Sequence, residues 1–165
     1  MLQYTICFIK RDQDLLLLNR RKAPTMGLWN GVGGKLEQNE TPSECIIRET
    51  FEETGIELES VTYAGNALFY SEQGNSGMYI FITDLPEEMV LTTPINTTEG
   101  ILDWKRIDWI LDEDNQGVVS NLQKFLPEVL GGNYLQEYRF IYHDHQMQSY
   151  SVSPLVENEV KKVHK

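Results

Sequence analysis

A helix whose two ends are both specified by local residues constrains this chain more than any other feature. The run Thr41-Pro42-Ser43-Glu44 has the residues of a capping box, with proline at the first helical position. Gly55 supplies the stop, because glycine readily adopts the left-handed conformation that ends many helices. The sequence therefore predicts a helix of about thirteen residues between them.

Three carboxylates gather on one face of this helix. Glu49, Glu52 and Glu53 fall within one turn. The opposite face, which we expect to pack against the protein, carries Ile47, Phe51 and Thr54. Like charges three or four residues apart destabilise a bare helix, so the cluster favours a bound cation such as Mg²⁺ or Mn²⁺. The alternative is a solvated acidic face in which Arg48 pairs with its neighbours.

Short apolar runs on both sides of the helix predict strands. They cover residues 4–9, 15–18, 61–70, 78–83, 102–107, 134–142 and 147–152, with a glycine-rich turn expected over 72–77. Two more helices are expected at 108–111 and 118–130, the second broken or ended near Pro127, and residues 23–34 form a shaped loop. This pattern predicts one α+β domain, a mixed sheet flanked by helices, over residues 1–153. The polar tail, residues 154–165, is expected to fray.

Charge and composition narrow the possible partners. The net charge of −11 argues against binding duplex nucleic acid, which depends on Lys and Arg neutralising phosphates. No apolar run approaches membrane-spanning length and no secretory signal is visible, so we expect a cytoplasmic protein, monomer or homodimer, that makes no membrane contact. Cys7 and Cys45 are expected to be buried free thiols. An acidic chain that handles phosphates needs a divalent cation to offset charge repulsion.

The residues from 34 to 56 follow a spacing that belongs to one enzyme family. The fixed positions, with their intervals, are Gly34, five residues, Glu40, seven residues, Arg48-Glu49, two residues, Glu52-Glu53, one residue, Gly55 and Ile56. This segment resembles the Nudix box, with every fixed position filled. Thr50 stands where the family usually has an aliphatic residue. The order of the expected strands extends the similarity from Tyr4 to about Val152.

The resemblance implies an α/β/α sandwich and a metal-dependent hydrolase that uses Mg²⁺, or Mn²⁺, to neutralise phosphates and acidify water. The metal ligands it implies are the carbonyl of Gly33 and the carboxylates of Glu49, Glu52, Glu53 and, outside the box, Glu99. Glu49, Glu53 and Arg48 match the catalytic positions, with Glu49 the first choice for general base. Arg48 holds the box glutamates in place, and Glu40 has a structural role. A solvated loop carboxylate is the alternative for Glu99.

Within the family the chain looks most like the MutT-type 8-oxo-dGTP diphosphatases. Residues 29–35 are similar to a nucleotide-binding loop of one branch, which implies substrate contacts for Asn30 and Lys35. Arg20 and Arg21 match a place where such enzymes put a cation, and Asn115 resembles a base-reading asparagine of the bacterial branch. Ordinary turn asparagines and surface arginines are the alternatives. Tyr4, Thr5 and Met78 are candidates for lining a base pocket.

Three functions follow as hypotheses. The first is hydrolysis of 8-oxo-dGTP, a small-molecule nucleotide, to 8-oxo-dGMP and pyrophosphate. The second is a Nudix pyrophosphatase for ADP-ribose, a dinucleotide or a pterin triphosphate, because the box specifies the phosphoanhydride chemistry and not the leaving group. The third is a non-catalytic nucleotide sensor, against which the intact Glu49, Glu52 and Glu53 argue.

Overall fold

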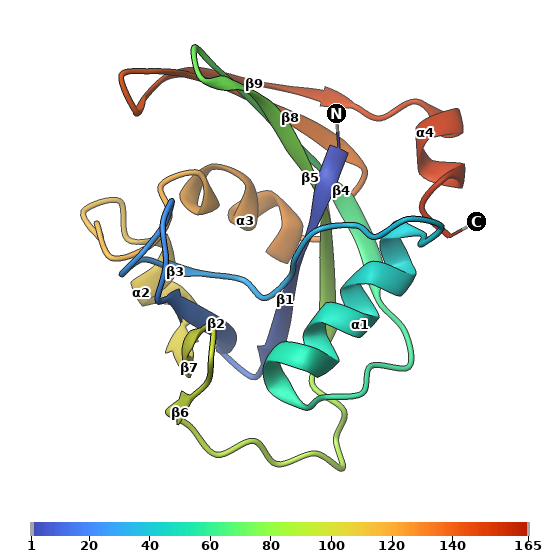
Figure 1. Cartoon of the computed structure of the whole chain (residues 1–165), viewed down its shortest axis with the longest axis vertical. Helices are drawn as coiled ribbons and strands as arrows, with labels where there is room; N and C mark the ends of the chain where they lie inside the picture. Colours follow the sequence, from blue (N-terminus) through green and yellow to red (C-terminus); the bar gives the residue numbers. More distant parts are fainter. Residues whose placement is uncertain (1, 165) are drawn as a thin grey trace.

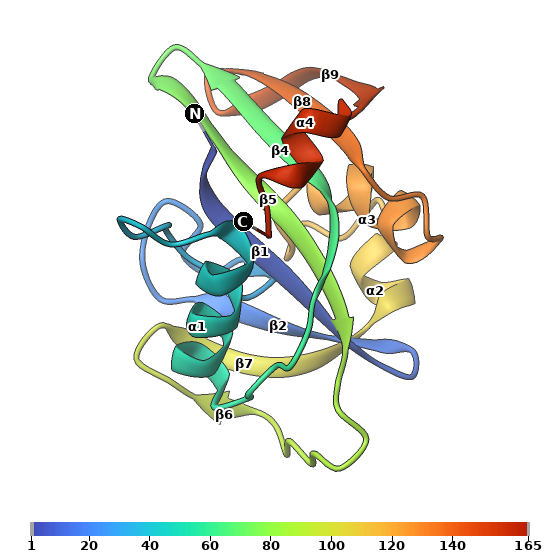
Figure 2. The same cartoon turned by 90° about the vertical axis from the view of Figure 1, so that its right-hand side faces the viewer.

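The computed structural model describes residues 2–164, which form a nine-stranded mixed sheet with helices on both faces (Figures 1 and 2). The strands are β1 (Leu2–Arg11), β2 (Asp14–Arg20), β3 (Trp29–Asn30), β4 (Thr62–Ser71), β5 (Gly74–Asp84), β6 (Ile95–Asn96), β7 (Gly100–Arg106), β8 (Gln136–His143) and β9 (Gln146–Pro154). The helices are α1 (Pro42–Thr54), α2 (Ile107–Leu111), α3 (Leu122–Leu130) and α4 (Glu157–Lys161). The sheet order is β6-β7-β2-β1-β5-β4-β8-β9, and β3 pairs with β2.

The sheet is mixed because β1 pairs with β5, and β4 with β8, in parallel, whereas the other strand pairs are antiparallel. Two apolar layers cover its faces. One lies under α2 and α3 and includes Ile110 and Phe125, and the other lies under α1 and includes Ile46. Figure 2 shows α1 on one side of the sheet and α2 and α3 on the other. The predicted α+β sandwich is confirmed.

Helix α1 has the ends that the sequence predicts. The Thr41 Oγ1 accepts a hydrogen bond from the Glu44 amide at 3.2 Å, and the Thr41 amide donates to the Glu44 carboxylate at 2.8 Å, which completes the capping box. At the other end Gly55 is left-handed, with φ 76°, and its amide donates to the Phe51 carbonyl. The helix is therefore fixed by local chemistry at both ends.

The packed face of α1 differs from the predicted one. Cys45, Ile46 and Thr50 are buried, whereas Phe51, expected on the packed face, is 51% exposed. The reason is that the helix is rotated about its axis so that Glu53 also faces the interior, where this residue is only 8% exposed. A helical wheel gives relative positions around the axis but does not show how the axis is rotated against the sheet.

Two element boundaries also differ from expectation. Strand β5 begins at Gly74, so the turn is only Glu72-Gln73, because Asn75 and Ser76 pair with Tyr70 and Phe69 of β4. Helix α3 begins at Leu122 rather than residue 118, and Pro127 lies inside it. Val118 is held extended by a bridge to Trp29. In both places strand pairing overrides local propensity, within a hairpin for β5 and with the distant Trp29 for Val118.

The last residues of the chain form a short helix and contact the rest of the fold, where fraying was the expectation. Helix α4 follows β9, and Val163 beyond it is fully buried in the apolar layer under α1. The apolar residues Leu155 and Val160 pack against the same layer. Among residues 2–164, none of the helices has the length and apolar character that a bilayer crossing requires.

Candidate active site

A glycine-rich loop beside the first half of β1 forms one wall of the site. Its backbone pairs with that strand, since the Thr5 amide donates to the Gly34 carbonyl at 2.8 Å and the Cys7 amide to the Val32 carbonyl at 2.7 Å. Gly33 has φ 155°, and a Cβ there would overlap the carbonyl of Thr5. Glycine is therefore required at this position, and the close pairing brings the loop against α1.

The glutamates of α1 meet this loop. The Glu53 carboxylate accepts a hydrogen bond from the Gly33 amide at 3.2 Å. Burial raises the pKa of Glu53 to about 7, and it also raises the pKa of Glu49 above its ordinary value. The two carboxylates thus stand in a site that disfavours their negative charge.

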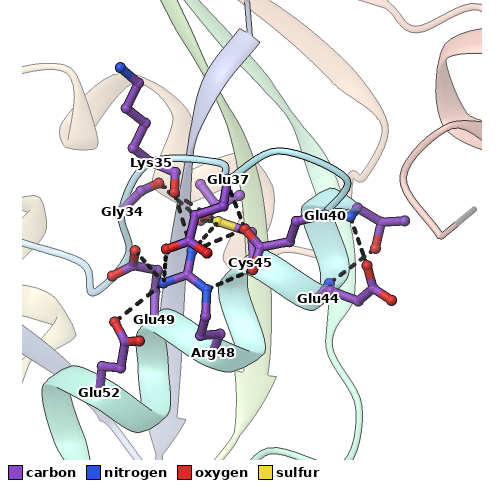
Figure 3. A network of polar contacts seen from close by, with 11 residues as sticks. Gly34, Lys35, Glu37, Glu40, Glu44, Cys45, Arg48, Glu49 and Glu52 are labelled. Atoms are coloured by element: carbon purple, nitrogen blue, oxygen red, sulfur yellow. Dashed lines mark hydrogen bonds and ion pairs between the residues drawn. The ribbon is translucent and has the colours of Figure 1, made fainter.

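Arg48 forms hydrogen bonds with several glutamates and with the loop (Figure 3). Its Nε and Nη2 donate to the two oxygens of Glu40 at 2.6 and 3.0 Å, and its Nη1 donates to Glu49 at 2.9 Å and to Glu52 at 3.3 Å. Nη2 also donates to the Lys35 carbonyl at 3.3 Å, which joins the loop to the helix. The hydrogen bonds from Arg48 lower the pKa of Glu40. The guanidinium therefore fixes where the glutamates point, as the resemblance implies.

The loop and the helix line a cleft of about 460 Å³. Its walls carry carboxylates, cations and backbone: Tyr4, Arg20, Gly33, Gly34, Lys35, Glu49, Glu52, Glu53, Thr98 and Glu99. A second cleft of about 490 Å³ shares five of these residues, namely Tyr4, Arg20, Gly33, Gly34 and Glu99. The two clefts are therefore adjacent, one rich in carboxylates and the other with a more apolar lining that includes Ile6 and Met78.

The residues of the carboxylate cleft fit a divalent metal ion. Glu53 is buried, yet no ion pair among residues 2–164 involves it. The charge of Arg20 lowers the pKa of Glu53, but burial outweighs this effect, so a further positive charge would stabilise the buried carboxylate. Carboxylate oxygens and a backbone carbonyl are the hard donors that Mg²⁺ and Mn²⁺ prefer. The donor set lines this cleft: Gly33, Glu49, Glu52, Glu53 and Glu99. No three of these carboxylates have oxygens within 4.8 Å of one another, so the fit is one of donor chemistry.

The structure brings some of the predicted substrate residues to the clefts and leaves others outside. Arg20 lines both clefts, Lys35 lines the carboxylate cleft, and Asn30 lines the second. Arg21 instead donates to the side chain of Asn96 and to the carbonyl of Thr97. The side chain of Asn115 makes two local hydrogen bonds. Its Nδ2 donates to the Trp109 carbonyl, and its Oδ1 accepts from the Gly117 amide. Neither Arg21 nor Asn115 lines these two clefts.

Tyr4, Thr5 and Met78, the candidates for a base pocket, all line the second cleft. Sequence reasoning missed Ser76 and Thr98. Ser76, which the sequence predicts in a turn, lies on β5. Its position two residues before Met78 is the signal that could have found it, since both residues line the second cleft. Thr98 could have been found because it is the neighbour of Glu99, which the sequence predicts as a metal ligand.

A separate group, made of two carboxylates and a histidine, lies at two neighbouring hairpin turns. His143 contacts Glu72 through Nδ1 and Asp144 through Nε2, at 3.4 Å for the latter. The ligand atoms of the three side chains lie within 4.8 Å of one another. Because the carboxylates contact opposite nitrogens of the ring, the arrangement is that of an exposed histidine held between two acids.

Gly34→Ala is expected to impair the site without unfolding the protein. A Cβ at this position would lie 2.5 Å from Oε2 of Glu49 and closer still to its other carboxylate atoms. The far end of a flexible side chain can move, so the substitution displaces the carboxylate from its place. We expect kcat/KM with Mg²⁺ to fall about tenfold to a hundredfold, with the melting temperature nearly unchanged. Gly131→Ala, far from the clefts, serves as the control, and equal activity in the two variants would contradict the placement of Glu49.

Comparisons with known proteins identify the family of this chain. The NUDIX domain family model matches residues 1–129. A mouse (Mus musculus) protein named oxidized purine nucleoside triphosphate hydrolase is 28% identical over 107 residues, which are 65% of this chain and 67% of that protein. Other curated relatives match over as little as 13% of their own length.

Solved structures give the same result. The crystal structure of a mutator MutT protein from Bacillus halodurans superposes with a TM-score of 0.74 at 26% identity, over 93% of this chain and 98% of that one. The NUDIX domain of Shewanella oneidensis NrtR, solved with ADP-ribose, has the same fold, with a TM-score of 0.60 at 18% identity over 81% of this chain and 88% of that one. The chain belongs to the Nudix hydrolase family, whose enzymes act on pyrophosphate bonds of nucleotide-like substrates.

Proposed function

We propose that this chain hydrolyses a nucleoside triphosphate to the monophosphate and pyrophosphate, with 8-oxo-dGTP as the preferred substrate and Mg²⁺ as the metal. The observation that carries the proposal is the shared wall of the two clefts. A phosphate chain beside Glu49 and Glu53 would place its nucleoside in the neighbouring cleft. The similarity to the mouse oxidized purine nucleoside triphosphate hydrolase favours an oxidised purine there.

The residues of the chain have distinct parts in this reaction. Arg20 and Lys35 line the carboxylate cleft and would attract the phosphates. A divalent ion held by Gly33, Glu49, Glu52, Glu53 and Glu99 would neutralise phosphate charge and make bound water more acidic. The water oxygen forms a bond to phosphorus, the bridging P–O bond breaks, and its electron pair stays with the leaving pyrophosphate. We assign the water's proton to Glu49, since its Oε1 is held by Arg48 and no hydrogen bond within residues 2–164 occupies its Oε2.

Asn30 is the proposed contact to the base. Its Oδ1 accepts from the Gly31 amide at 2.9 Å, whereas its amide nitrogen donates to no other group among the residues described. The free donor, in the cleft that Met78 also lines, can meet an acceptor on a purine edge. This hydrogen bond would select among bases and leave the phosphate chemistry unchanged.

The test is a comparison of kcat/KM, with Mg²⁺, for 8-oxo-dGTP, dGTP, ADP-ribose and a dinucleotide. We expect a clear preference for 8-oxo-dGTP in the wild type, and for Asn30→Ala about a tenfold higher KM for that substrate with little change in kcat. Asn75→Ala, at an exposed position of β5 outside both clefts, is the matched control. A preference for ADP-ribose or a dinucleotide would keep the chemistry but overturn the substrate. Binding without turnover of any compound would favour a nucleotide sensor.

A further inference from the structure

The end of the chain returns to the first turn of α1. Both views place the C-terminus beside the start of this helix (Figures 1 and 2). Val163 is fully buried, and it lies in the same apolar layer as Ile46 of α1 and Phe81 of β5. These last residues lie beyond the segment 1–129 that the family model matches. The family match therefore gives no account of them.

The returning segment also completes the N-terminal cap of α1. The first amides of a helix have no partner within it. Pro42 has no amide hydrogen, and the Glu44 amide donates to Thr41 Oγ1. The remaining amide, that of Ser43, donates to the carbonyl of Val163 at 3.2 Å. All the early amides of the helix that carries the glutamates are thus satisfied only when the chain end is in place.

A second polar contact joins the same two segments. The Ser43 hydroxyl and Nδ1 of His164 are 2.7 Å apart. Together with the buried Val163 side chain, the cap and this contact hold the first turn of α1. Ile46, in the same apolar layer, is one helical turn before Glu49 and two before Glu53. A rotation or a loosening of this end of α1 would therefore move the carboxylates that meet the Gly33 loop.

We propose that residues 155–164 are a brace that positions the glutamates of α1, so that the chain end contributes to divalent-metal affinity. Val163 and His164 are positioning residues and touch neither metal nor substrate. The proposal rests on the proposed function only in taking Glu49, Glu52 and Glu53 as metal ligands. It predicts that damage to the brace changes metal binding in protein that is still folded.

The test uses a chain shortened by its last three residues, with Val163→Ala as the milder variant if the shortened chain does not fold. Lys161→Ala is the matched control, because Lys161 is exposed and pairs only with the exposed Glu157 among the residues described. Mn²⁺ binding is measured by electron paramagnetic resonance well below the melting temperature. Hydrogen exchange of the metal-free protein reports separately on the amides of α1.

We expect the shortened chain to bind Mn²⁺ about threefold to tenfold more weakly, less than the loss typical of a residue that directly orients a metal ligand. Exchange is expected to speed up over the first two turns of α1, with the strands still protected. A lower melting temperature with unchanged Mn²⁺ affinity would show a merely structural role and overturn the brace. If the wild type bound no Mn²⁺ while exchange in α1 still responded, the metal assignment, and not the contact with α1, would have failed.

Discussion

Glu53→Gln is expected to lower kcat/KM with Mg²⁺ on the order of a thousandfold, because it removes a negative charge from the centre of the metal-compatible cleft. The amide oxygen of glutamine can still accept the hydrogen bond from Gly33, so the loop and helix should keep their places. Mn²⁺ affinity is expected to fall together with activity. Steady-state kinetics and metal titration of the same protein batch provide the measurement. Glu59→Gln, at an exposed position outside the clefts, is the matched control.

The stability of the same variant gives an independent check. The pKa of Glu53 is raised to about 7 by burial, whereas in the unfolded chain the group titrates near 4.5, the ordinary pKa of a glutamate. Between these values the folded, metal-free protein binds more protons than the unfolded chain, so the contribution of Glu53 to stability falls as the pH rises from about 4.5 to about 7. With chelator present, the melting temperature of Glu53→Gln relative to wild type is expected to rise between pH 5 and pH 8. A relative melting temperature that falls with pH would contradict the burial of this carboxylate.

Arg48→Ala is expected to have the second largest effect, a loss of activity of about a hundredfold. It leaves Glu40 and Glu49 without their cation, and both carboxylates are largely covered, with side-chain exposures of 13% and 16%. Breaking a covered ion pair leaves an uncompensated charge, and here we expect a loss of about 2 kcal/mol in the free energy of unfolding. Circular dichroism melts and kinetics on the same variant measure both effects.

Arg48→Lys separates charge from geometry. Lysine keeps the positive charge but cannot make the two parallel hydrogen bonds that Arg48 makes to Glu40. We expect it to recover most of the stability and only part of the activity. Arg106→Ala, which removes an exposed ion pair with Asp108, is the control and should change neither. Wild-type activity in Arg48→Ala would show that the guanidinium does not orient the glutamates.

The local chemistry of the sequence predicts α1 and its face of glutamates well. The capping box at Thr41 and the stop at Gly55 depend on residues within a few positions of each other, so the sequence alone contains their cause. The rotation of the helix about its axis, by contrast, is not determined by neighbouring residues. Phe51 is exposed and Glu53 is buried because the sheet and the Gly33 loop pack against one particular side.

Contacts formed only in the folded chain explain the remaining differences. Val163 is buried because the chain end reaches α1, more than a hundred residues earlier in the sequence, and neither composition nor periodicity indicates that contact. Ser76 belongs to a strand because β4 pairs with it. Arg21 and Asn115 have the residue types of a nucleotide site, but Arg21 binds the distant Asn96 and Asn115 binds the nearby Trp109 carbonyl. Residue type and spacing predict the glutamates of the first cleft, whereas the walls of the second cleft depend on the assembled fold.

The central claim is that this chain is a metal-dependent pyrophosphohydrolase whose activity depends on the glutamates of α1. The most direct measurement is the identification of the products formed from 8-oxo-dGTP by wild type and by Glu53→Gln, with Mg²⁺ and with chelator. We predict monophosphate and pyrophosphate in equal amounts from the wild type with Mg²⁺, and almost none with chelator or from the variant. Release of orthophosphate and nucleoside diphosphate, or equal turnover by the variant, would contradict the account.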